Sequence, residues 1–165
     1  MKIDEVFRCF RHLRESKEQN TGLRVEAVQK FGGGQKGDSW CCWLLTMVID
    51  LYWCGHLEKP ESEIPIKRLG ACDDVLAICL EKKWMAIRPA NDGGDYIYFY
   101  VKNPEGKTAK EMDAYHIGLV TDAKQTDFRG ISGNTSEDGL SSNGNGVYER
   151  YIKYTPKMKF AKIPL

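Results

Sequence analysis

Two side chains in this sequence could together perform nucleophilic catalysis, a thiol and an imidazole. Cys41 stands in the first turn of a helix that Asp38 or Ser39 is expected to cap, where unpaired N–H groups and the helix dipole stabilise a thiolate. His116 lies in a strand pattern on the same face as Gly118, and the glycine is expected to leave open space beside the ring. We therefore consider cysteine-dependent amide hydrolysis first.

Position alone leaves other interpretations open. Cys41 could equally be a buried side chain that opens a core helix, and Cys42 points only about 100° away around that helix. Asn134 ends the next predicted strand, and it would orient the imidazole of His116 if the two strands form a hairpin. An asparagine after a glycine is also a common turn residue.

The remaining cysteines do not form a pattern typical of metal sites or disulfides. The six cysteines occupy positions 9, 41, 42, 54, 72 and 79, without any C-x-x-C pair, and a structural zinc site needs closely spaced ligand pairs. We interpret Cys72 and Cys79 as buried thiols on one helix face. No metal and no cofactor are expected.

Helices come first along the chain and strands second. Apolar periodicity predicts helices over 3–18, 24–31, 40–54 and 73–82, and a glycine run at 32–34 gives a flexible lead into the third helix. Alternating patterns and β-formers predict strands over 84–88, 95–102, 115–122, 126–132, 146–154 and 158–163. Helices followed by an antiparallel sheet make an α+β domain, and we expect one domain over residues 1–165.

Composition excludes several function classes. The net charge is +1, which does not favour nucleic acid or an anionic membrane as a partner. The most apolar stretch, 40–54, is shorter than the roughly 20 residues of a membrane span. The first residues are charged and resemble no signal peptide, so we expect synthesis in the cytoplasm and a separate route to any extracellular target.

Four short motifs resemble those of CHAP and NlpC-like peptidoglycan hydrolases. G-D-S-W-C-C-W at 37–43 is similar to their cysteine box, and G-D-Y-I-Y-F at 94–99 to the strand start before their histidine. H-I-G-L-V at 116–120 resembles their histidine strand. G-N-T-S at 133–136, followed by G-V-Y-E-R at 146–150, looks like the closing segment of phage-type lytic domains. The motifs keep the family's order over 37–150, and the helical extension 1–31 lies outside the resemblance.

The resemblance implies a papain-like fold, in which N-terminal helices pack on an antiparallel sheet, and it implies roles for particular residues. The nucleophile directly follows an aromatic residue in this family, which favours Cys41 over Cys42. The implied set is Cys41 as nucleophile, His116 as base, Asn134 as orienting group, Gln35 and the Cys41 backbone as oxyanion donors, and Trp40, Ser132 and Ser136 as substrate contacts. Members of the family often carry a carboxylate where this chain has Ser132. We also expect the loop 135–145 to line a substrate groove.

The function implied is hydrolysis of amide bonds in bacterial peptidoglycan, by a stem-peptide endopeptidase or an N-acetylmuramoyl-L-alanine amidase. Such an enzyme would be a phage lysin or an antibacterial effector that acts on the cell wall or in the periplasm. A holin, a virion or a secretion system would deliver it. Two alternatives stay open: a papain-like protease or deamidase that acts on a protein, and an inactive papain-like domain that serves as a binding component of a phage particle.

Overall fold

The structure is a computed structural model that describes residues 1–90, 93–136 and 144–165, and it has the expected α+β architecture. The α-helices are α1 (Ile3–Arg8), α2 (Leu23–Gly32), α3 (Cys41–Asp50), α4 (Cys72–Glu81) and α5 (Ala109–Met112). A π-helical segment, Leu51–His56, continues α3, and a short 3₁₀ turn spans Glu61–Glu63.

Six strands form one antiparallel sheet. They are β1 (Met85–Ala86), β2 (Tyr96–Val101), β3 (Ala114–Ala123), β4 (Asp127–Thr135), β5 (Gly146–Lys153) and β6 (Met158–Lys162). Their order across the sheet is β1-β6-β2-β3-β4-β5. The alternating patterns therefore predicted the strands correctly, to within a few residues at each end.

The first helix is much shorter than its apolar pattern predicted. It ends at Arg8, because the chain beyond it turns and joins the sheet: Arg14 forms an isolated β-bridge with Gly146, and the Glu15 N–H donates to the Asn145 carbonyl. Leu13 is buried all the same. The apolar spacing thus identified buried positions correctly, while tertiary hydrogen bonds replaced the helix.

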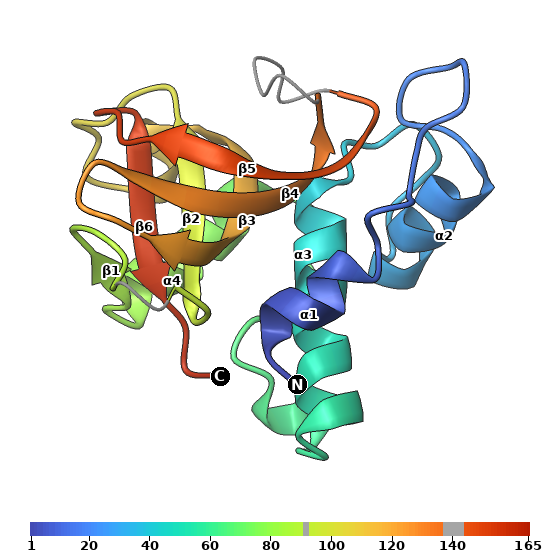
Figure 1. The fold of residues 1–165 in the computed structure, drawn as a ribbon, viewed down its shortest axis with the longest axis horizontal. Helices are drawn as coiled ribbons and strands as arrows, with labels where there is room; N and C mark the ends of the chain where they lie inside the picture. Colours follow the sequence, from blue (N-terminus) through green and yellow to red (C-terminus); the bar gives the residue numbers. More distant parts are fainter. Residues whose placement is uncertain (91–92, 137–143) are drawn as a thin grey trace.

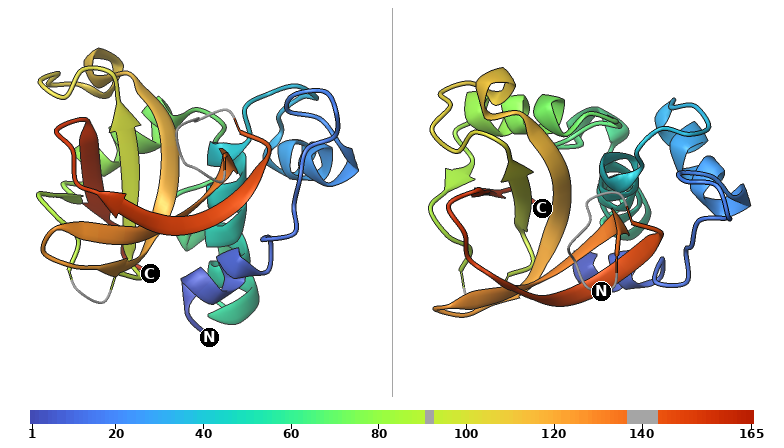
Figure 2. Two further views of the ribbon diagram at one scale, coloured as in Figure 1. Left: turned by 45° about the horizontal axis from the view of Figure 1, so that its top comes forward. Right: turned by 90° about the horizontal axis from the view of Figure 1, so that it is seen from above.

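Apolar side chains pack on both sides of the strongly curved sheet. Helix α3 lies against β3 and β4, and α2 lies on the side of α3 away from the sheet (Figures 1 and 2). Residues such as Leu44, Val48 and Ile117 fill the main core between helices and sheet. A smaller core, largely aromatic, includes Tyr98 and Phe128. Since Cys41 begins α3 and His116 lies on β3, this packing brings the two elements of the candidate site together.

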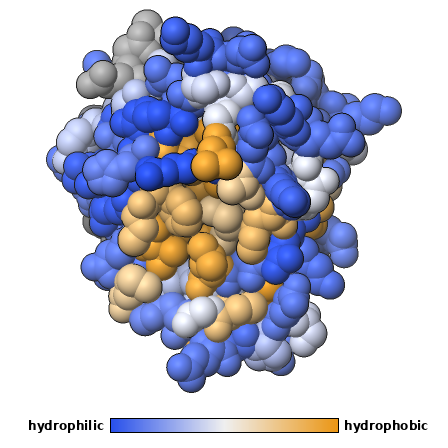
Figure 3. Space-filling model, turned by 90° about the vertical axis from the view of Figure 1, so that its right-hand side faces the viewer, coloured by the Kyte–Doolittle hydropathy of each residue, from blue (hydrophilic) through white to orange (hydrophobic). Residues whose placement is uncertain are grey.

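The side of the molecule that carries α2 has an apolar area. Figure 3 shows apolar side chains gathered on this side. A groove of about 400 Å³ between the chain after α1 and helix α2 is lined by Cys9, Phe10, His12, Leu13, Arg24, Ala27, Val28, Phe31 and Met47. Within the described ranges, no helix has the length and apolar character needed to cross a membrane.

Candidate active site

Cys41 is the first residue of α3, and its thiol is buried. Its side chain is 2% exposed. The N-cap is Trp40, so the expected cap by Asp38 or Ser39 is wrong: Asp38 Oδ2 instead accepts the Gln35 N–H at 2.8 Å. Cys41 still lies where a helix leaves its first N–H groups without intrahelical carbonyl partners. These groups can stabilise negative charge beside the sulfur.

His116 of β3 is buried near Cys41, and Ser132 of β4 contacts its ring. The ring Nε2 lies 3.0 Å from Ser132 Oγ in a buried contact. The ring Nδ1 has no hydrogen-bond partner among the described residues. The imidazole is near enough to the Cys41 thiol to lower its pKa. If Nε2 carries the proton and donates it to Ser132, Nδ1 is free to accept the proton of the thiol.

The net shift of the Cys41 pKa is upward, contrary to the expectation from the helix start. The Cys72 thiol makes the largest contribution, burial raises the pKa further, and His116 opposes both. The sulfurs of Cys41 and Cys72 are 3.9 Å apart. Burial removes the water that would solvate a thiolate, so it favours the neutral form of Cys41. A reaction at this sulfur would therefore need a base to take the thiol's proton.

Asn134 does not orient the imidazole, so this part of the expected set is wrong. Continuing the pairing of Leu119 with Ile131 by three residues along each strand would place Asn134 opposite His116. However, the register of β4 shifts beyond Ser132, and Asn134 has a φ of 53°. The side chain therefore turns away from the ring, and Ser132 makes the contact with the imidazole.

Asn134 instead joins β4 to the segment before Cys41. Its carboxamide lies 2.7 Å from Ser39 Oγ. In the amide orientation that satisfies its neighbours, its nitrogen donates to Glu15 Oε1 at 3.1 Å. The same Glu15 oxygen accepts the Trp40 indole N–H at 2.7 Å, and Ser39 Oγ lies 3.9 Å from Cys41 Sγ. Asn134 and Glu15 thus hold the segment that precedes Cys41 in place, through their contacts with Ser39 and Trp40.

Two of the three expected substrate contacts are buried. Trp40 is fully buried against Gly133 and bonded to Glu15, and Ser132 is 1% exposed. Both side chains contact other buried residues of the protein, so neither is accessible to a substrate in this conformation. Ser136 is half-buried at the end of β4, and its carbonyl accepts a hydrogen bond from Arg150; its substrate contact stays a prediction.

Gln35 is exposed in the loop before α3, and its backbone N–H donates to Asp38. The described contacts do not link its carboxamide to Cys41, and its role as an oxyanion donor stays a prediction. Residues 137–143 of the expected groove loop lie outside the described residues.

The space expected beside His116 is filled. A Cβ added at Gly118 would lie 2.6 Å from the ring and hydroxyl of Tyr98. Tyr98 is fully buried, and burial raises its pKa, which the nearby Ser132 hydroxyl partly opposes. Gly118 therefore makes room for an aromatic side chain of the smaller core, and substrate must approach from another direction.

A hollow of about 480 Å³ lies near the starts of α3 and α4. It is lined by Asp38, Ser39, Trp43, Arg68, Leu69, Gly70, Ala71 and Asp74. Ser39 precedes Cys41 by two residues, and Ala71 directly precedes Cys72. The two thiols do not themselves line this hollow, so it is a candidate for the approach of a substrate to the segment before Cys41.

The glycines near this hollow have a specific packing role. A Cβ at Gly32 or Gly70 would lie 2.0 or 2.1 Å from carbon atoms of the Trp43 ring. The indole is thus enclosed between the end of α2 and the loop before α4. Gly33 has a φ of 94° and ends α2 in the left-handed conformation. In the glycine run, expected as a flexible lead, Gly32 and Gly34 lie closely against Trp43, whereas a Cβ at Gly33 would meet nothing within 4 Å.

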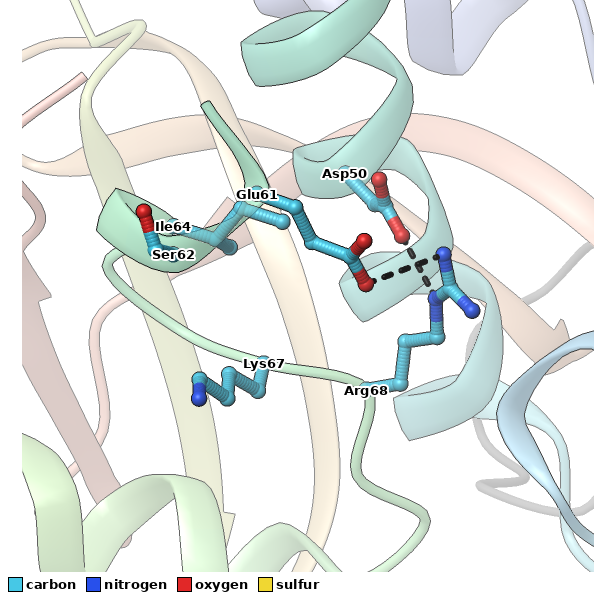
Figure 4. Close-up of a pocket in the computed structure, with 6 residues that line it drawn as sticks. All are labelled: Asp50, Glu61, Ser62, Ile64, Lys67 and Arg68. Carbon is cyan, nitrogen blue, oxygen red and sulfur yellow. Dashed lines mark hydrogen bonds and ion pairs between the residues drawn. The ribbon is translucent and has the colours of Figure 1, made fainter. Parts of the chain in front are cut away.

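A second hollow, of about 390 Å³, lies at the other end of α3. It is lined by Asp50, Glu61, Ser62, Ile64, Lys67 and Arg68 (Figure 4). Arg68 Nε donates to Asp50 Oδ2 at 2.6 Å, and the guanidinium lies 3.7 Å from Glu61. Arg68 lines both hollows, and its charge is compensated by these carboxylates.

Comparisons with known proteins identify no relative of this chain. Searches against protein-family models, curated proteins and solved structures find no match. Within residues 1–90, 93–136 and 144–165, no cluster of three or more His, Cys, Asp or Glu side chains is arranged to hold a metal ion. The site's chemistry is therefore argued from its own geometry.

Proposed function

We propose that this chain is a papain-like cysteine hydrolase that cleaves amide bonds of bacterial peptidoglycan. One observation carries the proposal: His116 lowers the pKa of the buried thiol at the start of α3, its Nε2 contacts Ser132, and its Nδ1 has no hydrogen-bond partner among the described residues. Peptidoglycan as the substrate rests on the four ordered motifs between residues 37 and 150.

The mechanism begins with a neutral thiol. Cys41 Sγ attacks the amide carbonyl carbon while its proton moves to His116 Nδ1, and the first N–H groups of α3 stabilise the negative oxygen. The imidazolium then gives its proton to the leaving amine, and the C–N bond breaks. Water attacks the thioester as His116 takes a proton, and the C–S bond breaks to release the acid. Ser132 keeps the ring oriented throughout.

Digestion of purified sacculi tests this function. Wild-type protein should release soluble fragments, and Cys41→Ala should lose at least about 10³-fold in rate, because removal of a nucleophile leaves only binding effects. Cys42→Ala is the matched control, since Cys42 is the next residue of the same buried turn. Mass spectrometry of the products would distinguish new stem-peptide N-termini from free lactyl ends.

Loss of digestion in Cys42→Ala with full activity in Cys41→Ala would reject the assignment. Cleavage of a denatured protein substrate, without any digestion of sacculi, would show an enzyme directed at proteins.

The burial of Cys41 favours a second candidate, an inactive papain-like domain that binds a partner. A thiol that is 2% exposed with a raised pKa is a poor resting nucleophile. Iodoacetamide labelling of the native protein distinguishes the two. An enzyme should alkylate at Cys41 faster than at the equally buried Cys79, whereas an inactive domain should leave both thiols unlabelled until it unfolds.

A further inference from the structure

The catalytic scheme leaves one thiol of the site unused. Cys72 begins α4 just as Cys41 begins α3, and the two sulfurs lie 3.9 Å apart. A disulfide needs sulfurs about 2 Å apart, so the reduced thiols are in contact and a modest rotation of side chains would join them. Among the described residues all six cysteines are free.

The surrounding structure holds the two cysteines against each other. Thr46 of α3 contacts the loop before α4: its hydroxyl accepts the Leu69 N–H at 3.4 Å and lies 3.2 Å from the Leu69 carbonyl oxygen. Thr46 itself is 1% exposed. This buried link fixes the start of α4 beside α3, so the thiol contact is a consequence of the fold.

A hollow large enough for a small oxidant lies next to the segments that precede this pair. Ser39 and Ala71, which come just before the two cysteines, line the same hollow of about 480 Å³. His116 lowers the pKa of Cys41, and the contact with Cys41 lowers the pKa of Cys72, although the net shift of both thiols is upward. Either sulfur of the pair can therefore react first, and the other resolves the product.

We propose that Cys41 and Cys72 form a reversible disulfide when the protein meets a hydroperoxide, and that this bond blocks the nucleophile. The sulfur of one thiol attacks the outer peroxide oxygen, the O–O bond breaks, and the sulfenic acid forms with release of water or an alcohol. The other thiol then attacks that sulfur, the S–O bond breaks, and the hydroxyl takes the proton of the second thiol and leaves as water. The two thiols lose two electrons, and the peroxide gains them.

The disulfide would stop catalysis because the Cys41 sulfur, already bonded to a second sulfur, could no longer form a thiolate and attack a carbonyl carbon. An external thiol would restore both groups by exchange. This consequence for activity rests on the proposed function, whereas formation of the bond does not.

Peptide mapping tests the bond directly. The reduced native protein is treated with hydrogen peroxide, quenched with iodoacetamide and digested without reductant. We expect a cross-link between the peptide that contains Cys41 and the one that contains Cys72, absent after dithiothreitol. A mass spectrum without this cross-link, in a protein whose thiols have reacted with peroxide, would overturn the proposal.

Variants identify the partners. Cys42 also lies near Cys72, whose pKa it raises, so Cys42→Ser should keep the cross-link and Cys41→Ser should abolish it. The reverse result would assign the disulfide to Cys42 and reject ours. Cys79→Ser is the matched control on α4, since Cys79 is equally buried and should not affect the bond.

Activity separates the two proposals. Peroxide should lower wild-type digestion of sacculi at least tenfold, and dithiothreitol should restore it. In Cys72→Ala and Cys72→Ser, Cys41 should pass on to the sulfinic acid, and dithiothreitol should not restore digestion. A cross-link that forms in a protein without hydrolytic activity would reject the enzyme and keep the disulfide. Activity without a cross-link would do the opposite.

Discussion

At the scale of single residues, the orienting group of the histidine is a hydroxyl. Ser132 Oγ contacts His116 Nε2 at 3.0 Å, both side chains are about 1% exposed, and Nδ1 has no other partner among the described residues. A neutral hydroxyl can donate to or accept from Nε2, so it orients the ring without adding negative charge. In the proposed mechanism the imidazolium would thus be stabilised less than it would be by a carboxylate.

We therefore expect Ser132→Ala to lower kcat/KM for sacculi roughly tenfold to hundredfold, about 1.4–2.8 kcal/mol of transition-state stabilisation. The cause is loss of the hydroxyl that orients the imidazole ring, and Ser132→Thr should retain most activity because it keeps that hydroxyl. Ring nitrogen NMR would report which ring nitrogen of His116 carries the proton in each protein. An unchanged protonation site and an unchanged rate in Ser132→Ala would contradict this role.

At the scale of elements, the helix starts are positioned by close packing around one indole. Trp43, in the first turn of α3, lies against Gly32 at the end of α2 and Gly70 in the loop before α4. Any side chain at these glycines would displace either the ring or the backbone. Trp43 and Gly70 both line the hollow of about 480 Å³. The shape of that hollow therefore depends on having glycine against the Trp43 ring.

Gly70→Ala should lower the free energy of unfolding by about 1–3 kcal/mol, the usual cost of overpacking. Its Cβ would lie 2.1 Å from Trp43 Cζ2. Gly55→Ala is the control, because nothing lies within 4 Å of a Cβ at Gly55. Urea denaturation would measure both. Adding Trp43→Phe to Gly70→Ala should recover part of the loss if the ring is the obstacle, and no recovery would refute this explanation.

At the scale of the whole molecule, one buried carboxylate ties the N-terminal helix to the sheet. Glu149 of β5 has a side chain that is 3% exposed, and it pairs with Arg8 at 2.7 Å and with Arg11. Burial by itself would raise the pKa of Glu149, but hydrogen bonds from Arg8, Thr121 and Arg11 outweigh it and lower the pKa to about 2. The charged form is therefore favoured by folding.

This shift predicts a loss of stability in acid. Because the folded pKa is below the ordinary value of 4.5, the contribution is complete above about pH 4.5 and disappears as the pH falls toward 2, by at most about 3 kcal/mol. Glu149→Gln should be less stable than wild type at pH 7 and should lose less on acidification. The exposed Glu63→Gln should follow wild type. Parallel pH profiles for wild type and Glu149→Gln would contradict this assignment.

The sequence by itself located most of the elements, although not α5, and it selected Cys41 and His116 as candidate side chains. Periodicity of three to four residues located α2, α3 and α4, and alternation located the strands, because both patterns follow from local backbone geometry and burial of one face. Cys41 and His116 could be selected because a helix start and a strand are local features. The apolar pattern failed after Arg8, where hydrogen bonds to residues near Gly146 replaced the helix.

Only the tertiary structure decided what surrounds those two side chains. Strict alternation would place Asn134 opposite His116, but the register shift in β4 turns Asn134 toward Ser39 and leaves Ser132 at the ring. The contact between Cys41 and Cys72, and with it the direction of the thiol's pKa, depends on how two helix starts meet. Such neighbours are far apart in sequence, and their approach is set by packing of the whole core, which no local pattern encodes.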